Sequence, residues 1–240
     1  GRHFVTTSDR EAQLYATEGL RLLGRMEHGR PVWSAAFSGD SRRFATASSD
    51  GYARVWDTET GDAVGDALLH QRADGLGSGD QIASIDLDRT GSHLVVITLQ
   101  NEAWLWEIPS SKQIGERKLG VKTAKFSPDG QRLLLSGNSG AELWDSELKQ
   151  RIAGFERETW QPKLVLHQAI FSPDGNKVLT LGYDDGATEI ELWDAATYQR
   201  RIVIRDPSRV HWVVFNGDGS RLATAGDDDQ ARETDEIEVV

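Results

Sequence analysis

The chain has no cysteine among its 240 residues. This absence excludes disulfide bonds, thiol nucleophiles and thiolate metal sites together. No run of 18 apolar residues is present, so we expect no helix that spans a membrane and no membrane partner. The formal net charge is −11, which disfavours binding to nucleic acid or to an anionic lipid surface. A cysteine-free, acidic chain of this kind fits a cytoplasmic protein.

Methionine and proline are also scarce, with one and six residues, whereas the chain has 24 glycines and eight tryptophans. This composition favours strands and turns over helices. The first residue is Gly1 and not an initiator methionine. An upstream targeting segment can therefore be absent from this piece, and we expect additional domains in the same polypeptide.

One pattern recurs five times along the chain. It consists of an apolar residue, two further residues, a small or apolar residue, one more residue, and then Phe or Leu. The pattern begins at Val32, Ile82, Val121, Leu166 and Val210. Its closing Phe or Leu positions are spaced by 50, 39, 45 and 44 residues. A period of about 40 to 45 residues is typical of propellers, solenoids and helical arrays.

The residues after each pattern decide between these architectures. A tight turn comes first and is clearest as Ser-Pro-Asp-Gly at 127–130 and 172–175. A β-rich run and a second turn follow, and then an alternating strand ends on an aromatic residue and an acid. The aromatic residues of these strands are Trp56, Trp106, Trp144 and Trp193. Each repeat thus predicts four antiparallel strands, which excludes helical arrays.

Phe-Ser-Pro-Asp-Gly, Asp-Gly and Trp-Asp at this spacing resemble WD repeats. The resemblance implies an all-β fold, a β-propeller of four-stranded antiparallel blades. It divides a single propeller segment, 1–240, into five to six blades: 1–27 (partial), 28–70, 71–119, 120–160, 161–206 and 207–240 (partial). The family most often closes its ring with seven blades. The sequence of residues 33–57 is also similar to repeats of large bacterial signalling proteins.

The resemblance further implies a hydrogen-bond network that joins His, Ser or Thr, Asp and Trp. Only the second blade has a histidine, an acid and a tryptophan at suitable places. The expected members are His28, Ser48 or Thr46, Asp50 and Trp56. The repeated tryptophans are expected to be core residues between neighbouring sheets, and not a stacking platform for bases.

The family geometry places the first strand of each blade along an axial channel and the loops entering it on one face, the top rim. The residue after the first apolar position varies between repeats, as Trp33, Ala83, Lys122, His167 and His211. Trp212 follows the last of these, and Trp160 lies in the loop 155–163. Two interpretations are open: local packing against neighbouring loops, or a rim that binds a protein or peptide partner.

Two further loops have compositions that resemble those of ligand-binding loops, but they lack the arrangement that binding requires. The glycine-rich segment 71–80 leads into a strand and not into a helix, so it lacks the mechanism of a phosphate-binding loop. Asp227, Asp228 and Asp229 form an acidic run for which calcium is conceivable, but the spacing is not that of a known calcium loop and solvation is the default. We expect the third strand of this last repeat at 236–240.

Three functions compete. The first is a non-catalytic protein-interaction or ligand-sensing scaffold without a cofactor, a regulatory part of a larger bacterial signalling protein linked to a kinase or a STAND-type NTPase. The second is a propeller hydrolase, in which His167 and His211 would meet Asp184, Asp185 and Asp227 in the channel. The third is nucleic-acid binding, suggested only by basic residues near the bottom turns: Arg42, Arg43, Arg132, Lys177 and Arg221.

Overall fold

A computed structural model describes residues 2–69, 81–138, 140–155, 165–183, 188–206, 209–226 and 231–234. Over these ranges the chain is all-β and forms six antiparallel sheets, as predicted. The described ranges contain one helical element, the three-residue 3-10 helix η1 (Glu18–Leu20), and no helix in them is long and apolar enough to cross a membrane. The chain divides into two compact units, Gly1–Phe126 and Ser127–Val240.

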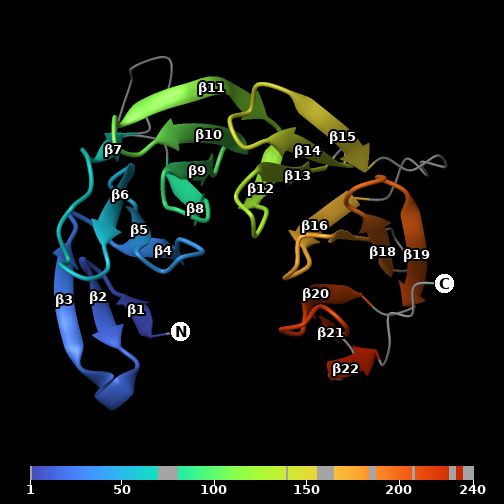
Figure 1. Ribbon diagram of the computed structural model, residues 1–240, viewed down its shortest axis with the longest axis horizontal. Coiled ribbons are helices and arrows are strands. Elements are labelled where there is room, and N and C mark those ends of the chain that lie inside the picture. Colours follow the sequence, from blue (N-terminus) through green and yellow to red (C-terminus); the bar gives the residue numbers. More distant parts are fainter. Residues whose placement is uncertain are drawn as a thin grey trace. The chain divides into compact units, whose positions relative to one another are not determined.

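The first unit begins with a three-stranded sheet and continues with two four-stranded sheets in which strands that follow in sequence lie side by side (Figure 1). The first sheet contains β1 (His3–Thr7), β2 (Glu11–Ala16) and β3 (Leu22–Glu27). The second sheet contains β4 (Val32–Phe37), β5 (Arg43–Ser48), β6 (Tyr52–Asp57) and β7 (Leu68–Leu69). The third sheet contains β8 (Ile82–Leu87), β9 (His93–Thr98), β10 (Glu102–Glu107) and β11 (Lys112–Leu119), and β12 (Val121–Phe126) ends the unit.

The second unit repeats the same up-and-down order. It begins with β13 (Arg132–Gly137), β14 (Gly140–Asp145) and β15 (Arg151–Phe155). A four-stranded sheet follows, with β16 (Val165–Phe171), β17 (Lys177–Tyr183), β18 (Thr188–Asp194) and β19 (Arg200–Asp206). The last sheet contains β20 (Val210–Phe215), β21 (Leu222–Gly226) and β22 (Ala231–Thr234).

The third strand of the last sheet differs from the prediction. We expected it at 236–240, but β22 ends at Thr234, which pairs with Leu222 of β21. We expected the acidic run that begins at Asp227 and extends to Glu236 to lie in a loop, and acidic residues are depleted in strands. Pairing with β21 overrides that weak preference, so the connection between the second and third strands is shorter than expected.

The turns that follow the first strands are held by their own side chains. In the turn at 127–130 the Ser127 hydroxyl donates to Asp129, and Asp129 Oδ1 accepts the backbone N–H of Gln131 at 2.9 Å. Ser127 Oγ also accepts the backbone N–H of Arg132 at 3.0 Å. The turn at 172–175 repeats these contacts. Its Gly175 has φ +72, a left-handed conformation that glycine adopts without steric cost.

Among the described residues, the hydrophobic clusters within each unit lie between consecutive sheets. Buried Leu14 and Met26 of the first sheet pack with Phe44 of the second. The repeated tryptophans contribute to these cores: Trp56 and Trp106 pack against them from partly buried positions, and Trp193 is 6% exposed. A sheet of this kind has no core of its own, because its apolar faces are buried only against its neighbours.

Candidate interaction surface

The variable position after the first apolar residue coincides with a β-bulge in four sheets. In the first unit the pairing register shifts between Val32 and Ser34 and between Ile82 and Ser84. In the second unit it shifts between Leu166 and Gln168 and between Val210 and Trp212. The residues skipped by the register are Trp33, Ala83, His167 and His211. A bulge leaves its extra residue unpaired and re-aims its side chain, and bulges are enriched beside functional sites.

Two tryptophans, one at a bulge and one directly after a bulge, expose large apolar surfaces. The side chain of Trp33 is 67% exposed in the first unit, and that of Trp212, the residue after the bulge at His211, is 66% exposed in the second unit. His167 and Ala83 are exposed, whereas Lys122 and His211 are half-buried. Tryptophan normally buries most of its surface, so a largely exposed indole on a rigid strand is a candidate for contact with a partner.

An aromatic and cationic cluster surrounds one bulge of the second unit. The ring centroids of His167 and Tyr183 are 5.4 Å apart, and the Arg209 guanidinium lies over the Tyr183 ring at 4.1 Å. Sequence reasoning selected His167 but missed Tyr183 and Arg209. A signal was available, because Tyr183 is an aromatic residue at a strand end where β5 and β9 end in Ser48 and Thr98.

Several predicted features lie outside the described residues. These are Trp160 with its loop, the glycine-rich segment 71–80, the acidic residues 227–229, and Asp184 with Asp185. The arrangement of His167 and His211 around those acids, which the hydrolase hypothesis requires, therefore stays untested. Among the described residues, no group of three His, Cys, Asp or Glu side chains could hold a metal ion.

In the second sheet, Thr46 joins the expected histidine and tryptophan. Its Oγ1 lies 2.9 Å from His28 Nε2 and accepts the Trp56 Nε1–H at 2.8 Å. Ser48, the other candidate, instead accepts the backbone N–H of Asp50 at 3.3 Å. Both hydroxyls are buried, so burial does not separate them, and the hydrogen-bond partners identify Thr46 as the member of the network.

Asp50 reaches the same network through Arg54. Arg54 Nη1 lies 2.8 Å from His28 Nδ1 and donates to Asp50 Oδ2 at 3.2 Å. Burial would raise the pKa of Asp50, but hydrogen bonds from Ser48 and Tyr52 and the charge of Arg54 hold that pKa below its ordinary value. The network thus includes an arginine that sequence reasoning did not select.

The contact with Arg54 determines the protonation of His28. A guanidinium only donates, so His28 Nδ1 accepts, and we assign the ring proton to Nε2, which donates to Thr46. A second proton on the ring would break the bond to Arg54. Burial and the neighbouring Arg54 charge accordingly lower the pKa of His28 from 6.5 to about 4. His28 is therefore a neutral structural residue at physiological pH.

A sheet without this histidine uses a carboxylate instead. In the second unit, Trp193 Nε1 donates to Thr180 Oγ1 at 3.1 Å, and Thr180 Oγ1 donates to Glu191 at 3.3 Å. Glu191 pairs with Thr180 in the strand register, as Arg54 pairs with Thr46. It is 2% exposed and accepts from Arg200 at 2.9 Å. The tryptophan and the threonine recur, while the third partner changes.

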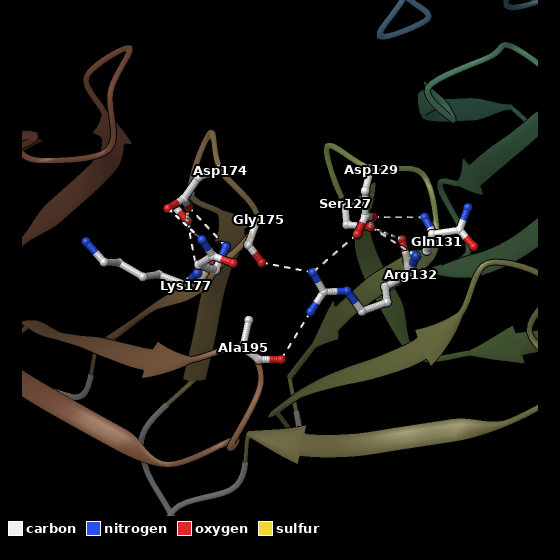
Figure 2. A network of polar contacts seen from close by, with 10 residues as sticks. Ser127, Asp129, Gln131, Arg132, Asp174, Gly175, Lys177 and Ala195 are labelled. Atoms are coloured by element: carbon white, nitrogen blue, oxygen red, sulfur yellow. Dashed lines mark hydrogen bonds and ion pairs between the residues drawn. The ribbon is translucent and has the colours of Figure 1, made fainter.

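The basic residues near the turns have structural contacts. Figure 2 shows Arg132 at the end of its turn, reaching the neighbouring turn and strand end of the second unit. Its Nη2 donates to the Gly175 carbonyl at 2.9 Å and its Nη1 to the Ala195 carbonyl at 3.1 Å. The guanidinium also lies 5.5 Å from the centre of the Phe171 ring. Arg132 therefore links its own sheet to the next one through side-chain hydrogen bonds.

The same contact is made five residues after the start of other turns. Arg43 Nη1 donates to the Gly91 carbonyl at 3.0 Å in the first unit, and Lys177 Nζ to the Gly219 carbonyl at 3.4 Å in the second. A cation that binds a backbone carbonyl of its own fold is less available for a phosphate. Three of the five basic residues behind the nucleic-acid hypothesis are thus accounted for by packing.

Known proteins match this chain through its repeats. Residues 21–57 match the family model described as "WD domain, G-beta repeat", a range that contains His28, Thr46, Asp50 and Trp56. The match shows that residues 21–57 are similar to a WD repeat, and the six antiparallel sheets have the all-β, blade-like fold that such repeats form.

Three relatives illustrate the similarity. The serine-threonine kinase receptor-associated protein of Gallus gallus is 24% identical over 122 residues, 49% of this chain and 32% of the relative. Eukaryotic translation initiation factor 3 subunit I of Pyricularia oryzae is 29% identical over 109 residues, 45% of this chain and 30% of the relative. Apoptotic protease-activating factor 1 of Homo sapiens is 24% identical over 169 residues, 66% of this chain and 13% of the relative. The matches thus span about a third or less of each relative's length.

Proposed function

We propose that this chain is a non-catalytic protein-interaction scaffold whose partner-binding positions are the bulged rim residues and their neighbours. WD-repeat proteins generally act as protein-interaction scaffolds and are typically non-enzymatic. The observation that carries the proposal is the exposure of Trp33 at a β-bulge (67%) and of Trp212 directly after one (66%). Both residues belong to first strands that are hydrogen-bonded into sheets, so their backbone is held before a partner arrives.

The rim residues suit a protein or peptide partner. Interface hot spots are enriched in tryptophan, tyrosine and arginine, since these side chains bury much area and order few rotatable bonds. Trp33 and Trp212 provide exposed indoles, and Tyr183 with Arg209 provides a stacked pair whose guanidinium edge suits an acidic group. We propose that the partner also contacts Trp160, Lys122 and His211.

The setting of the scaffold is part of the proposal. The three relatives are a receptor-associated protein, a subunit of a translation initiation factor and a protease-activating factor. Each of these names refers to a further protein with which, or on which, the relative works. We propose accordingly that the chain is a regulatory, sensor-type part of a larger cytoplasmic signalling protein. Linkage to a bacterial kinase or a STAND-type NTPase, and closure into a seven-bladed ring, stay predictions.

Partner capture with matched variants tests the rim. Trp33→Ala and Trp212→Ala are compared with Leu20→Ala and Val203→Ala, which remove exposed side chains (69% and 40%) away from the bulged positions. Recovery of partners from a lysate of the source cells is quantified for each variant, with the fold checked by circular dichroism.

We expect the tryptophan variants to weaken capture about tenfold or more, because truncating an anchor residue costs about 2 kcal/mol or more. The leucine and valine variants should capture partners like the unchanged protein. Equal recovery with all four variants would show that the rim is not the binding surface.

A further inference from the structure

The first unit has a solvent-open cavity of about 940 Å³ between its first and second sheets. None of the bulged rim residues lines it. The volume is at the upper end of the range for small-molecule sites, which is roughly 300 to 1,000 Å³. Its apolar lining comes from Ala16 and Leu23, and most of the remaining lining is charged or polar.

The wall formed by the first sheet is basic. It contributes Arg2, His3 and Arg21 and no acid. The two arginines are held by their backbone, since the Arg2 carbonyl accepts from Thr17 N at 2.8 Å and the Arg21 carbonyl accepts from Ala16 N at 2.9 Å. Both side chains are exposed and make no ion pair within the described ranges. Their donors are available to a ligand.

The opposite wall, formed by the second sheet, is mainly acidic. It contributes Asp40, Asp57 and Glu59 together with a single cation, Arg42. Backbone N–H groups of Thr60 and Glu59 donate to Asp57 Oδ1 at 3.0 and 2.9 Å, and they hold the pKa of Asp57 below its ordinary value. This wall therefore keeps its negative charge at neutral pH.

No ion pair joins the two walls in the part of the chain that the structure describes. The cavity thus holds positive charge on one side and negative charge on the other, across a space open to solvent. A simple anion would meet one favourable wall and one repulsive wall, and so would a simple cation. A ligand that carries both charges at opposite ends complements both walls at once.

Two buried polar atoms of the lining also lack a partner. Thr58 is only 3% exposed, and its Oγ1 has no hydrogen-bond partner among the described residues. The same holds for Nδ1 of His3, which is half-buried. Buried polar atoms in folded proteins are almost always satisfied, so each exception calls for an explanation. Both residues line the cavity, so a polar ligand there would supply a missing partner once the side chain rotates toward it.

We propose that this cavity binds a small zwitterionic molecule of the class of free amino acids and short peptides. Its carboxylate would bind at Arg2 and Arg21, and its ammonium group at the acidic wall. A ligand amide or carboxylate would hydrogen-bond the Thr58 hydroxyl, and a modest apolar side chain would lie against Leu23. Such a ligand would make the chain a sensor of a small metabolite in addition to a scaffold.

Titration with four related probes tests the charge requirement. Leucine and the dipeptide leucyl-glycine carry both charges, N-acetyl-leucine only the negative one, and leucinamide only the positive one. Binding is followed by backbone amide shifts of Ala16, Leu23 and Ser41 in two-dimensional NMR spectra. We expect at least one zwitterion to bind about tenfold tighter than both singly charged analogues. No shift at about 10 mM probe, or equal binding of N-acetyl-leucine, would overturn the proposal.

Variants of the two walls test the residues. Arg21→Gln and Glu59→Gln should each weaken binding of the zwitterion about tenfold. Arg30→Gln and Glu27→Gln remove exposed charges of the same kinds outside the cavity and should leave it unchanged. Equal losses in the controls would reduce the effect to overall charge and contradict the site.

Thr58→Val separates a binding role from a structural one. Because the hydroxyl has no partner in the described part of the chain, its removal should leave the melting temperature of the free protein unchanged or slightly higher. Affinity for the zwitterion should nevertheless fall several-fold. A lower melting temperature with unchanged affinity would assign the hydroxyl to the fold and refute its role here. None of these results depends on the rim, so failure of either proposal is recognised separately.

Discussion

Thr46→Val tests how much the buried hydroxyl of the second sheet stabilises the first unit. The Thr46 Oγ1 accepts from Trp56 Nε1 at 2.8 Å and, in the tautomer assigned above, from His28 Nε2 at 2.9 Å. Valine has nearly the same shape and leaves no cavity. The substitution therefore removes an acceptor and little else, and two N–H groups lose their partner.

The expected loss follows from burial. Leaving a buried polar group unsatisfied costs about 1 to 3 kcal/mol. His28 is 6% exposed and bears the full penalty, whereas the half-buried Trp56 retains partial access to water. We therefore expect Thr46→Val to lower the free energy of unfolding of the first unit by about 2 to 4 kcal/mol. This is a large fraction of a typical domain stability.

Native-state hydrogen exchange is the suitable assay, because the chain divides into two compact units and a single unfolding midpoint could mix their transitions. Exchange of amides in β5 and β6 reports the opening free energy of the affected sheet. Thr58→Val is the matched control, because Thr58 lies in the same unit, is buried (3% exposed), and its Oγ1 has no hydrogen-bond partner among the described residues. A loss in Thr46→Val below about 0.5 kcal/mol, or no larger than the control's, would refute the reasoning.

Three further predictions concern pH, the Arg132 hydrogen bonds and a turn. His28 has a pKa of about 4 in the folded chain against 6.5 ordinarily, so its stabilising effect is complete above pH 6.5 and declines as pH falls toward 4, where only the unfolded chain binds the proton. Between pH 7 and pH 4, the difference in unfolding free energy between the unchanged protein and His28→Gln should shrink by about 3 kcal/mol. A difference that stays constant with pH would contradict the assigned neutral state. Arg132→Met should lower the unfolding free energy of the second unit by about 1 to 3 kcal/mol, because it removes the donors to the Gly175 and Ala195 carbonyls. Arg132→Lys should keep part of this stabilisation. Equal stability of the unchanged protein and both variants in urea unfolding would show that these hydrogen bonds do not stabilise the unit. Gly175→Ala should lower the unfolding free energy of the second unit by about 1 to 2 kcal/mol, because φ at this position is +72 and the new Cβ would lie 3.3 Å from Pro128 Cδ. An unchanged midpoint in urea unfolding would show that the turn relaxes.

The fold was largely predictable from sequence because the repeats carry local signals. The Ser-Pro-Asp-Gly turns bind their own backbone, and period-2 patterning marks each strand. Tryptophans at equivalent places predicted the cores between sheets, where Trp193 is 6% exposed. The failure at the last sheet has the same origin, since strand 231–234 depends on pairing with its neighbour and not on its own composition.

The candidate site was predictable only in part. Variation between repeats singled out Trp33, His167, His211 and Trp212, but periodicity gave no indication that Trp33, His167 and His211 are bulge residues. A bulge is defined by the register of two strands, and one strand's sequence does not specify it. Tyr183 and Arg209 were missed because their contact joins residues far apart in the chain, although the aromatic residue at the end of β17 was a signal for Tyr183.

The sequence by itself determined the repeat, the strand order, the turns and the chemical character of the variable positions, because these follow from residues near one another in the chain. Tertiary structure alone decided which polar groups meet. It placed Thr46 between His28 and Trp56, directed Arg132 to carbonyls of the next turn, and set a basic wall opposite an acidic one. These outcomes depend on distances between sheets, and such distances follow from packing and not from local patterns.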